Sequence, residues 1–335
     1  MRRNSWLCIA TLITLSACAS KSKQAETIGG LQQREILLEE PTLDVAIDPN
    51  KVREYYRDFL AVTNENKLYS EALRRLADLE LKTGEANISS DETTDARDGQ
   101  KQALSAIKLY QSYLKTYPHD QANDLILYQL AKAYELTGQT QRALDTFDKI
   151  MAHYPATRYR DEVQFRRGEM LFLLRRFEDA ELAYASIISG KKDSVFFEKA
   201  MYKYGWTHFK QNRFKPALNA FFAIMDRKQQ QGMIKANQTL PELEGSDREL
   251  LDDTLRATSL CFAYQTNEYT IAQYLDETGQ RPYEPLIYLS LGRLHLEKDR
   301  IKDAADTFMT FGRNNQRNQI SFLIGLDRLG VKLRR

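Results

Sequence analysis

Catalytic motifs are what this sequence most plainly lacks. It has no G-x-S-x-G elbow, no H-E-x-x-H motif, no glycine-rich phosphate loop and no cysteine pair at metal-binding spacing. Its carboxylates lie on amphipathic segments, where a run of charge is usually the solvated face of a helix. Its four histidines are scattered, two at expected helix-packing positions and two beside turn prolines: His208, His295, His119 and His153. We therefore expect no enzyme, no metal and no other cofactor.

Long apolar runs are missing as well. The N-terminus carries Arg2 and Arg3, followed by an apolar core from Trp6 to Leu15. A membrane-spanning helix needs about 20 apolar residues, so this core is too short to span a bilayer and is typical of a cleaved signal peptide.

The end of this segment, Leu15-Ser16-Ala17-Cys18, resembles the lipobox of bacterial lipoproteins. The resemblance implies that residues 1–17 are removed and that the sulfur of Cys18 carries a diacylglycerol. A multiply acylated terminus anchors a protein stably to a membrane. Because Ala19 and not Asp follows the cysteine, the resemblance to enterobacterial lipoproteins implies an outer-membrane protein that faces the periplasm. The alternatives are an ordinary secretory peptide and a buried helix.

Net charge and thiols are scarce in the chain that would remain. Removal of Arg2 and Arg3 from the 48 basic residues leaves 46, equal to the 46 acidic ones, so the chain lacks the basic footprint of a nucleic-acid-binding protein. Cys261 would be the one free thiol, which excludes an internal disulfide. Its apolar surroundings favour packing over reactivity.

A repeated helical pattern organises residues 101–227. Four alanines recur every 37 residues, at Ala106, Ala143, Ala180 and Ala217. Each is followed four residues later by an aromatic ring and seven later by a bulky side chain, which is one face of a helix. Three have a small residue twelve positions earlier, namely Ala131, Gly168 and Gly205. A missing side chain there lets a second helix cross closely, so each unit is predicted to be an antiparallel helix pair.

This pattern resembles the tetratricopeptide repeat. The segment DLILYQLAKAYELTGQTQRALDTFDKIMAHYP carries its residues at Leu130, Ala131, Tyr134, Ala143, Phe147 and Pro155. Two further copies follow, and a later one carries Gly292, Ala304 and Phe308 at the same offsets. The resemblance implies an all-α fold, a tetratricopeptide-type α-solenoid of antiparallel helix pairs.

The pattern divides the chain into segments. Residues 18–50 are expected to form a lipidated, flexible tether, and residues 51–227 the repeat array, with a solvated acidic insertion at 85–100. An irregular insertion at 228–246 precedes further helix pairs at 247–335. The end of the chain is apolar and basic, and three explanations are open: it caps the array poorly, the array continues in longer relatives, or a partner covers it.

Family resemblance also predicts where partners bind. The concave surface of such arrays is lined by the fifth, ninth and twelfth residues of each repeat, and here these are Tyr128, Lys132, Glu135, Phe165, Glu169, Phe172, Tyr202, Trp206, Phe209, Leu289, Arg293 and Leu296. Aromatic rings with rim charges are typical of binding hot spots. Phe165 and Tyr202 could instead pack against the adjacent helix, whereas we expect Trp206 to be exposed.

The lipobox and repeats together resemble BamD-like outer-membrane lipoproteins of the Gram-negative envelope. This resemblance implies a non-enzymatic scaffold in outer-membrane protein assembly or another envelope complex. It would bind envelope proteins through the groove and the membrane through its lipid, with no nucleic-acid or small-molecule ligand. The alternatives are a peptidoglycan-associated or cell-division coordinator, and an enzyme whose catalytic domain lies beyond Arg335.

Overall fold

The computed structural model describes residues 48–62, 67–89, 93–190, 192–235, 244–265 and 270–314, and every regular element in these ranges is an α-helix. Contacts separate Met1–Ile47 from Asp48–Arg335, and the helices belong to the second unit. The expected signal peptide, Cys18, the tether up to residue 47 and the end of the chain from residue 315 lie outside the described residues. The helices are α1 (Pro49–Val62), α2 (Lys67–Ile88), α3 (Thr93–Thr116), α4 (Asn123–Leu136), α5 (Thr140–His153), α6 (Arg160–Leu173), α7 (Phe177–Ile188), α8 (Phe197–Lys210), α9 (Phe214–Gln230), α10 (Gly245–Tyr264), α11 (Ile271–Thr278), α12 (Glu284–Glu297) and α13 (Ile301–Asn314).

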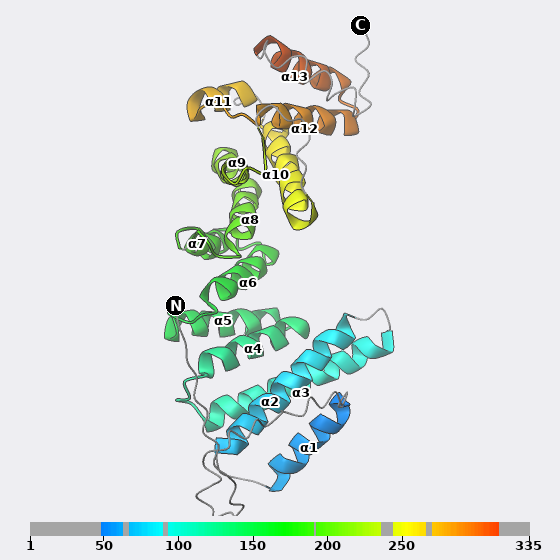
Figure 1. The fold of residues 1–335 in the computed structure, drawn as a ribbon, viewed down its shortest axis with the longest axis vertical. Coiled ribbons are helices and arrows are strands. Elements are labelled where there is room, and N and C mark those ends of the chain that lie inside the picture. The colour runs from blue at the N-terminus through cyan, green and yellow to red at the C-terminus, as the bar shows by residue number, and fades with distance from the viewer. Residues whose placement is uncertain are drawn as a thin grey trace, which may run out of the picture. The chain divides into compact units, whose positions relative to one another are not determined.

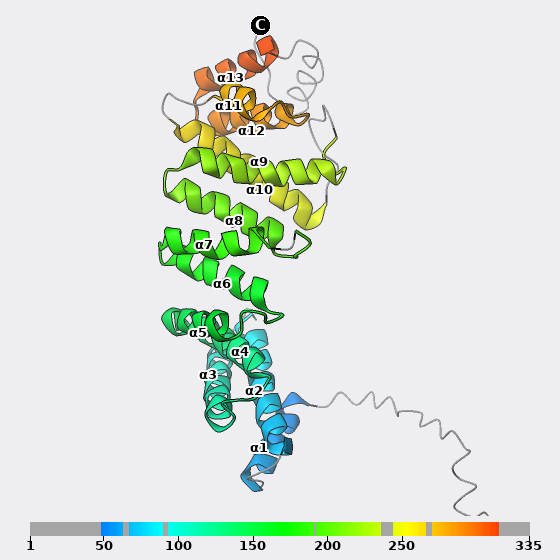
Figure 2. The same cartoon turned by 90° about the vertical axis from the view of Figure 1, so that its left-hand side faces the viewer.

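Consecutive helices pack as pairs, and the pairs stack on one another (Figures 1 and 2). The pairs are α2 with α3, α4 with α5, α6 with α7, α8 with α9, and α12 with α13. We call the first member of each pair its first helix. Helix α1 packs against α2, and α10 packs against α9 and α12. The predicted helix pairs are therefore confirmed.

The turn inside four of these pairs repeats in detail. One residue of each turn adopts a positive φ: 71° at Gly138, 59° at Arg175, 57° at Asn212 and 56° at Asp299. The next residue's backbone N–H donates to the carbonyl five residues earlier, as from Arg213 to His208 at 2.9 Å. This left-handed helix ending favours glycine, yet only the first copy has one. The sequence pattern did not identify it.

The small residues ahead of each alanine allow the close crossing that was predicted. A methyl group built on Gly168 would lie 2.6 Å from the Tyr184 ring, and one on Gly205 would lie 2.5 Å from the Phe221 ring. Carbon atoms pack at about 3.5–4.0 Å, so neither position has room for a side chain. Both rings are fully buried. In these two repeat units, an aromatic ring of the second helix therefore packs directly against the backbone of the first helix.

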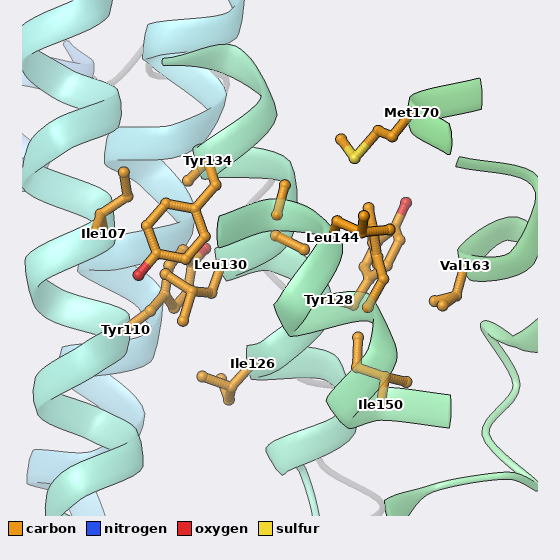
Figure 3. Packing of buried hydrophobic residues seen from close by; sticks show 14 of the residues in the cluster. Ile107, Tyr110, Ile126, Tyr128, Leu130, Tyr134, Leu144, Ile150, Val163 and Met170 are labelled. Atoms are coloured by element: carbon orange, nitrogen blue, oxygen red, sulfur yellow. The ribbon is translucent and has the colours of Figure 1, made fainter. Parts of the chain in front are cut away.

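The core runs along the stack in two clusters of buried side chains. One extends from α2 to the start of α8 and the other from α9 to α13. In the first cluster, Tyr134 points from α4 towards Ile107 and Tyr110 of α3, whereas Tyr128 points to the opposite side, towards Val163 of α6 (Figure 3). Helix α4 thus contacts the pair before it and the pair after it, as expected of a repeat array.

The predicted acidic loop at 85–100 is wrong. Its described residues are helical, because α2 has 22 residues and α3 has 24, whereas α4 has 14. The extra turns lie against each other where Gly84 meets Gly99: a methyl group on Gly99 would lie 2.8 Å from the carbonyl oxygen of Gly84. These backbones approach closely only because both residues lack a side chain.

The segment after Arg227 also differs from its prediction. Helix α9 continues to Gln230, and residues 236–243 lie outside the described part of the chain. The predicted pair at 247–278 is α10 and the short α11, which has eight residues. Helix α10 packs mainly on α9 and α12, while Tyr274 of α11 contacts Phe222 of α9, with ring centroids 4.5 Å apart. This part of the array departs from the regular repeat.

Candidate interaction surface

Ion pairs join the first helices of successive repeats. Lys132 of α4 lies 2.8 Å from Glu85 of α2, Arg166 of α6 lies 3.0 Å from Glu135 of α4, and Lys203 of α8 lies 2.7 Å from Glu169 of α6. We call these three pairs the first-helix ladder. Each is partly exposed and contributes about 0.2–1 kcal/mol, so the ladder sets the register of the helices more than it stabilises them.

The ladder occupies three of the four charged residues that were predicted to contact a partner. Lys132, Glu135 and Glu169 all bind the neighbouring helix, and Glu169 also accepts a hydrogen bond from the Tyr184 hydroxyl. Burial raises the pKa of the Glu135 carboxyl even though Arg166 acts to lower it. Each basic side chain of the ladder is matched by a carboxylate, so these pairs offer a partner no excess charge of either sign.

Several predicted contact residues are packing residues instead. Tyr128 and Leu289 are only 6% and 3% exposed, so their assignment to a partner groove is corrected: both belong to the core. The Tyr128 ring stacks on Tyr159 with centroids 4.9 Å apart, and its hydroxyl donates to Glu162. Phe165 is partly buried against the rings of Tyr184 and Phe196, at 6.0 and 5.5 Å, which agrees with the packing alternative. Residues at the fifth repeat position therefore mainly join neighbouring repeats.

An aromatic cluster begins where the ladder ends. Trp206 replaces the ladder residue Glu169 at the same repeat position and lies 6.3 Å from Tyr202 and 5.1 Å from Phe209, measured between ring centroids. Phe209 in turn contacts Phe214 at 5.5 Å and Tyr264 at 5.8 Å. We call these five side chains the aromatic surface.

The rings of the aromatic surface are unequally accessible. Tyr264 is 56% exposed, whereas Tyr202, Trp206, Phe209 and Phe214 are partly buried on the second core cluster. Trp206, expected to be exposed, also packs on the buried Phe221 ring at 6.3 Å. Such rings are anchored on one side and open on the other, which is typical of hot spots at protein interfaces.

The remaining predicted residues flank this surface. Phe172 of α6 contacts Phe177 at 5.3 Å and lies 6.0 Å from the Lys203 ammonium, between the ladder and the aromatic surface. On α12, Arg293 is exposed and Leu296 is partly buried. The sequence pattern missed Tyr264 because α10 does not follow the repeat register.

A buried lysine positions the helix that carries Tyr264. The Lys228 side chain is 2% exposed, and its Nζ lies 2.6 Å from both the Glu198 carboxylate of α8 and the Asp247 carboxylate of α10. Burial acts to lower the pKa of Lys228, but the two carboxylates raise it overall. Removing one partner of such a buried pair typically costs about 3–5 kcal/mol. Lys228 therefore ties the first turn of α10 to the preceding pair.

A second candidate surface lies beside α1. An apolar groove of about 490 Å³ is lined by Val52, Tyr55, Tyr56, Phe59, Leu68, Glu71, Ala72 and Arg75. Tyr55 and Leu68 in it are 68% and 64% exposed. Nothing in the described part of the chain shows what covers this groove.

Polar chemistry elsewhere in the described ranges is sparse. No group of three His, Cys, Asp or Glu side chains there is arranged to hold a metal ion. His208 and His295 are 3% and 6% exposed and pack between helices as predicted, and Cys261 is buried, as predicted for a packing residue. Of the described helices, none is both long and apolar enough to cross a bilayer.

One repeat of this chain matches a known protein family. The family model described as Tetratricopeptide repeat matches residues 126–157, which span α4, α5 and the turn after them. The fold is a tetratricopeptide-type α-solenoid. The pairs α6–α7, α8–α9 and α12–α13 repeat the same positive-φ turn, and each packs an aromatic ring on a glycine of its first helix. A comparison with curated proteins finds no relative that matches this sequence.

Several solved structures are similar to this chain. A tetratricopeptide repeat protein from Parabacteroides merdae is 14% identical, with a TM-score of 0.45, covering 83% of this chain and 93% of its own. BtubC from P. vanneervenii is 15% identical, with a TM-score of 0.46, covering 77% and 89%. A kinesin light chain from Podosopora anserina is 10% identical, with a TM-score of 0.43, covering 69% and 98%. At these identities and TM-scores no function is transferred from them.

Proposed function

We propose that this chain is a non-enzymatic scaffold that binds partner proteins through the aromatic surface of α8, α9 and α10. One observation carries the proposal: paired charges along the first helices give way at Trp206 to partly exposed rings that rest on a rigid core. Interface hot spots are enriched in Trp and Tyr, and rings already held by packing lose little freedom on binding.

We further propose that the scaffold is lipid-anchored through Cys18 at the periplasmic side of the outer membrane and works in envelope or outer-membrane protein assembly. The lipobox-like residues before Cys18 and the Ala19 that follows support this location. The near-neutral charge after residues 1–17 argues against nucleic acid as the partner. A peptidoglycan-associated or cell-division role is the alternative, and the identity of the captured partner distinguishes the two.

Tyr264→Ser tests the binding surface with the least damage to the fold. Tyr264 is 56% exposed, so its truncation should leave the melting temperature nearly unchanged while weakening partner recovery about tenfold, in the range of hot-spot losses. The matched control is Leu182→Ser on α7, a side chain 68% exposed that lies outside the aromatic surface. Affinity capture of the native lipoprotein from solubilised membranes compares the two. Equal partner recovery with both variants would refute the binding surface.

Cys18→Ser tests the anchor independently. The variant should appear in the soluble periplasmic fraction, whereas the native chain stays with outer membranes after high-salt washing. Continued membrane attachment of the variant would remove the lipid from the proposal and leave the binding surface untouched.

A further inference from the structure

We infer that the partner segment is acidic as well as apolar, an inference that rests on the proposed function and specifies its partner. The charges beside the aromatic surface carry this inference. The Lys298 ammonium lies 5.3 Å from the centroid of the Tyr264 ring. On α8, Lys210 is exposed and follows Trp206 by one helical turn. Both cations therefore border the rings that a partner would cover.

Two arginines extend this basic border over α10 and α12. The Ser259 hydroxyl of α10 donates to the Ser290 hydroxyl of α12 at 2.9 Å, which identifies the faces where the two helices meet. Arg256 precedes Ser259 by three residues, and Arg293 follows Ser290 by three. Each arginine therefore lies on the same face of its helix as the serine that contacts the other helix. Both are exposed. Arg256 also lies close to the Tyr202 hydroxyl. Burial raises the pKa of Tyr202 overall, and the charge of Arg256 acts in the opposite direction.

The balance of charge here differs from that of the first-helix ladder. The four cations bordering the aromatic surface make no ion pair within the described part of the chain: Lys210, Arg256, Arg293 and Lys298. By the same helical spacing three carboxylates share these faces: Asp252, which forms an ion pair with Arg248, Asp253 beside Tyr202, and Glu297 one turn after Arg293. The border is therefore net basic, whereas the ladder charges are matched.

A net basic border around half-open rings fits a segment in which acidic residues flank bulky apolar anchors. The rings would bind the anchors, and the cations would attract and orient the flanking carboxylates. Charges at the rim of an interface act mainly on partner choice and association rate and are screened by salt. We therefore expect a salt-dependent preference for acidic segments, superimposed on apolar binding that depends little on salt.

The experiment uses the full-length lipoprotein in neutral detergent and three fluorescent peptides. All share Leu and Phe anchors one helical turn apart, and the flanking residues are Glu, Ser or Lys. Anisotropy is measured in about 50 mM and about 500 mM NaCl, because the Debye length falls severalfold over this range. The Glu peptide should bind about tenfold more tightly than the Lys peptide at low salt, and the ratio should shrink to about twofold at high salt.

Charge reversal locates the preference. Arg256→Glu combined with Arg293→Glu should abolish or invert the ratio. Lys108→Glu combined with Lys149→Glu changes the net charge equally on the exposed faces of α3 and α5 and should leave the ratio unchanged. Equal binding of the three peptides, or loss of the preference in both double variants, would overturn the acidic partner while the aromatic surface stands. If no peptide binds, or if Tyr264→Ser leaves all affinities unchanged, the proposed binding surface itself fails.

Discussion

Replacing Gly205 with alanine tests the packing that positions Trp206, because two effects of opposite sign compete at this residue. In an open helix, Gly→Ala stabilises by about 1 kcal/mol through helix propensity. Here the new methyl group would lie 2.5, 2.8 and 2.9 Å from three atoms of the fully buried Phe221 ring. Overpacking of this kind costs about 1–3 kcal/mol. The rigid surroundings of the ring favour the upper part of that range, and we expect a net loss of about 1–2 kcal/mol.

Urea unfolding measures this loss. Helical circular dichroism reports the whole array, and the fluorescence of Trp206, the neighbour of the substituted residue, reports its local environment. Both midpoints should move to lower urea, and Phe221→Leu in the Gly205→Ala background should recover part of the loss by making room. An alanine variant more stable than the native chain would mean that α8 and α9 do not cross on bare backbone, and the repeat geometry argued here would be wrong.

Three further substitutions or treatments have definite expected outcomes. Arg175→Gly should raise stability by about 1 kcal/mol, because Arg175 holds a φ of 59° that glycine adopts freely, and a lower urea midpoint would contradict the turn geometry. Burial lowers the pKa of His208 below 6.5, so the neutral side chain contributes its full stability above pH 6.5, and this contribution is lost as the pH falls from 6.5 through the lowered pKa. His208→Tyr should therefore make the urea midpoint depend less on pH between pH 7.5 and 5, and an unchanged pH dependence would contradict this. Burial also raises the pKa of the Cys261 thiol, so a maleimide should label it only after unfolding, and fast labelling of the native chain would show an accessible thiol.

The repeat pairs were predictable because their signal is local and recurs. The spacing of 37 residues, with small, aromatic and bulky side chains at fixed offsets, places both helices of each unit and the contact between them. Ala180 and Gly168, for example, are both fully or almost fully buried at a helix crossing, as their positions in the pattern predict. Where the period breaks, this information is lost. The extra turns of α2 and α3 meet at Gly84 and Gly99, which lie 15 residues apart and carry no periodic signal.

The candidate site was only partly predictable for a related reason. The position of a residue in the repeat predicts which way its side chain faces, but it does not predict which side chains of neighbouring helices contact it. Lys132 and Glu169 occupy predicted groove positions, yet each forms an ion pair with a side chain of another first helix that the repeat register does not reveal. Tyr264 belongs to α10, outside the repeat, and its contact with Phe209 follows from no repeat position. Ion pairing and ring contacts between helices required the structure.

Site-directed photo-crosslinking in cells tests the central claim most directly, namely that partners bind the aromatic surface. A photoreactive phenylalanine analogue replaces Tyr264 of α10 in one variant and Leu182 of α7 in the other, and both side chains are exposed. The account predicts a discrete protein adduct from position 264 that disappears when Tyr202 is also changed to alanine, and no such adduct from position 182. An adduct from position 182 with none from position 264 would contradict it.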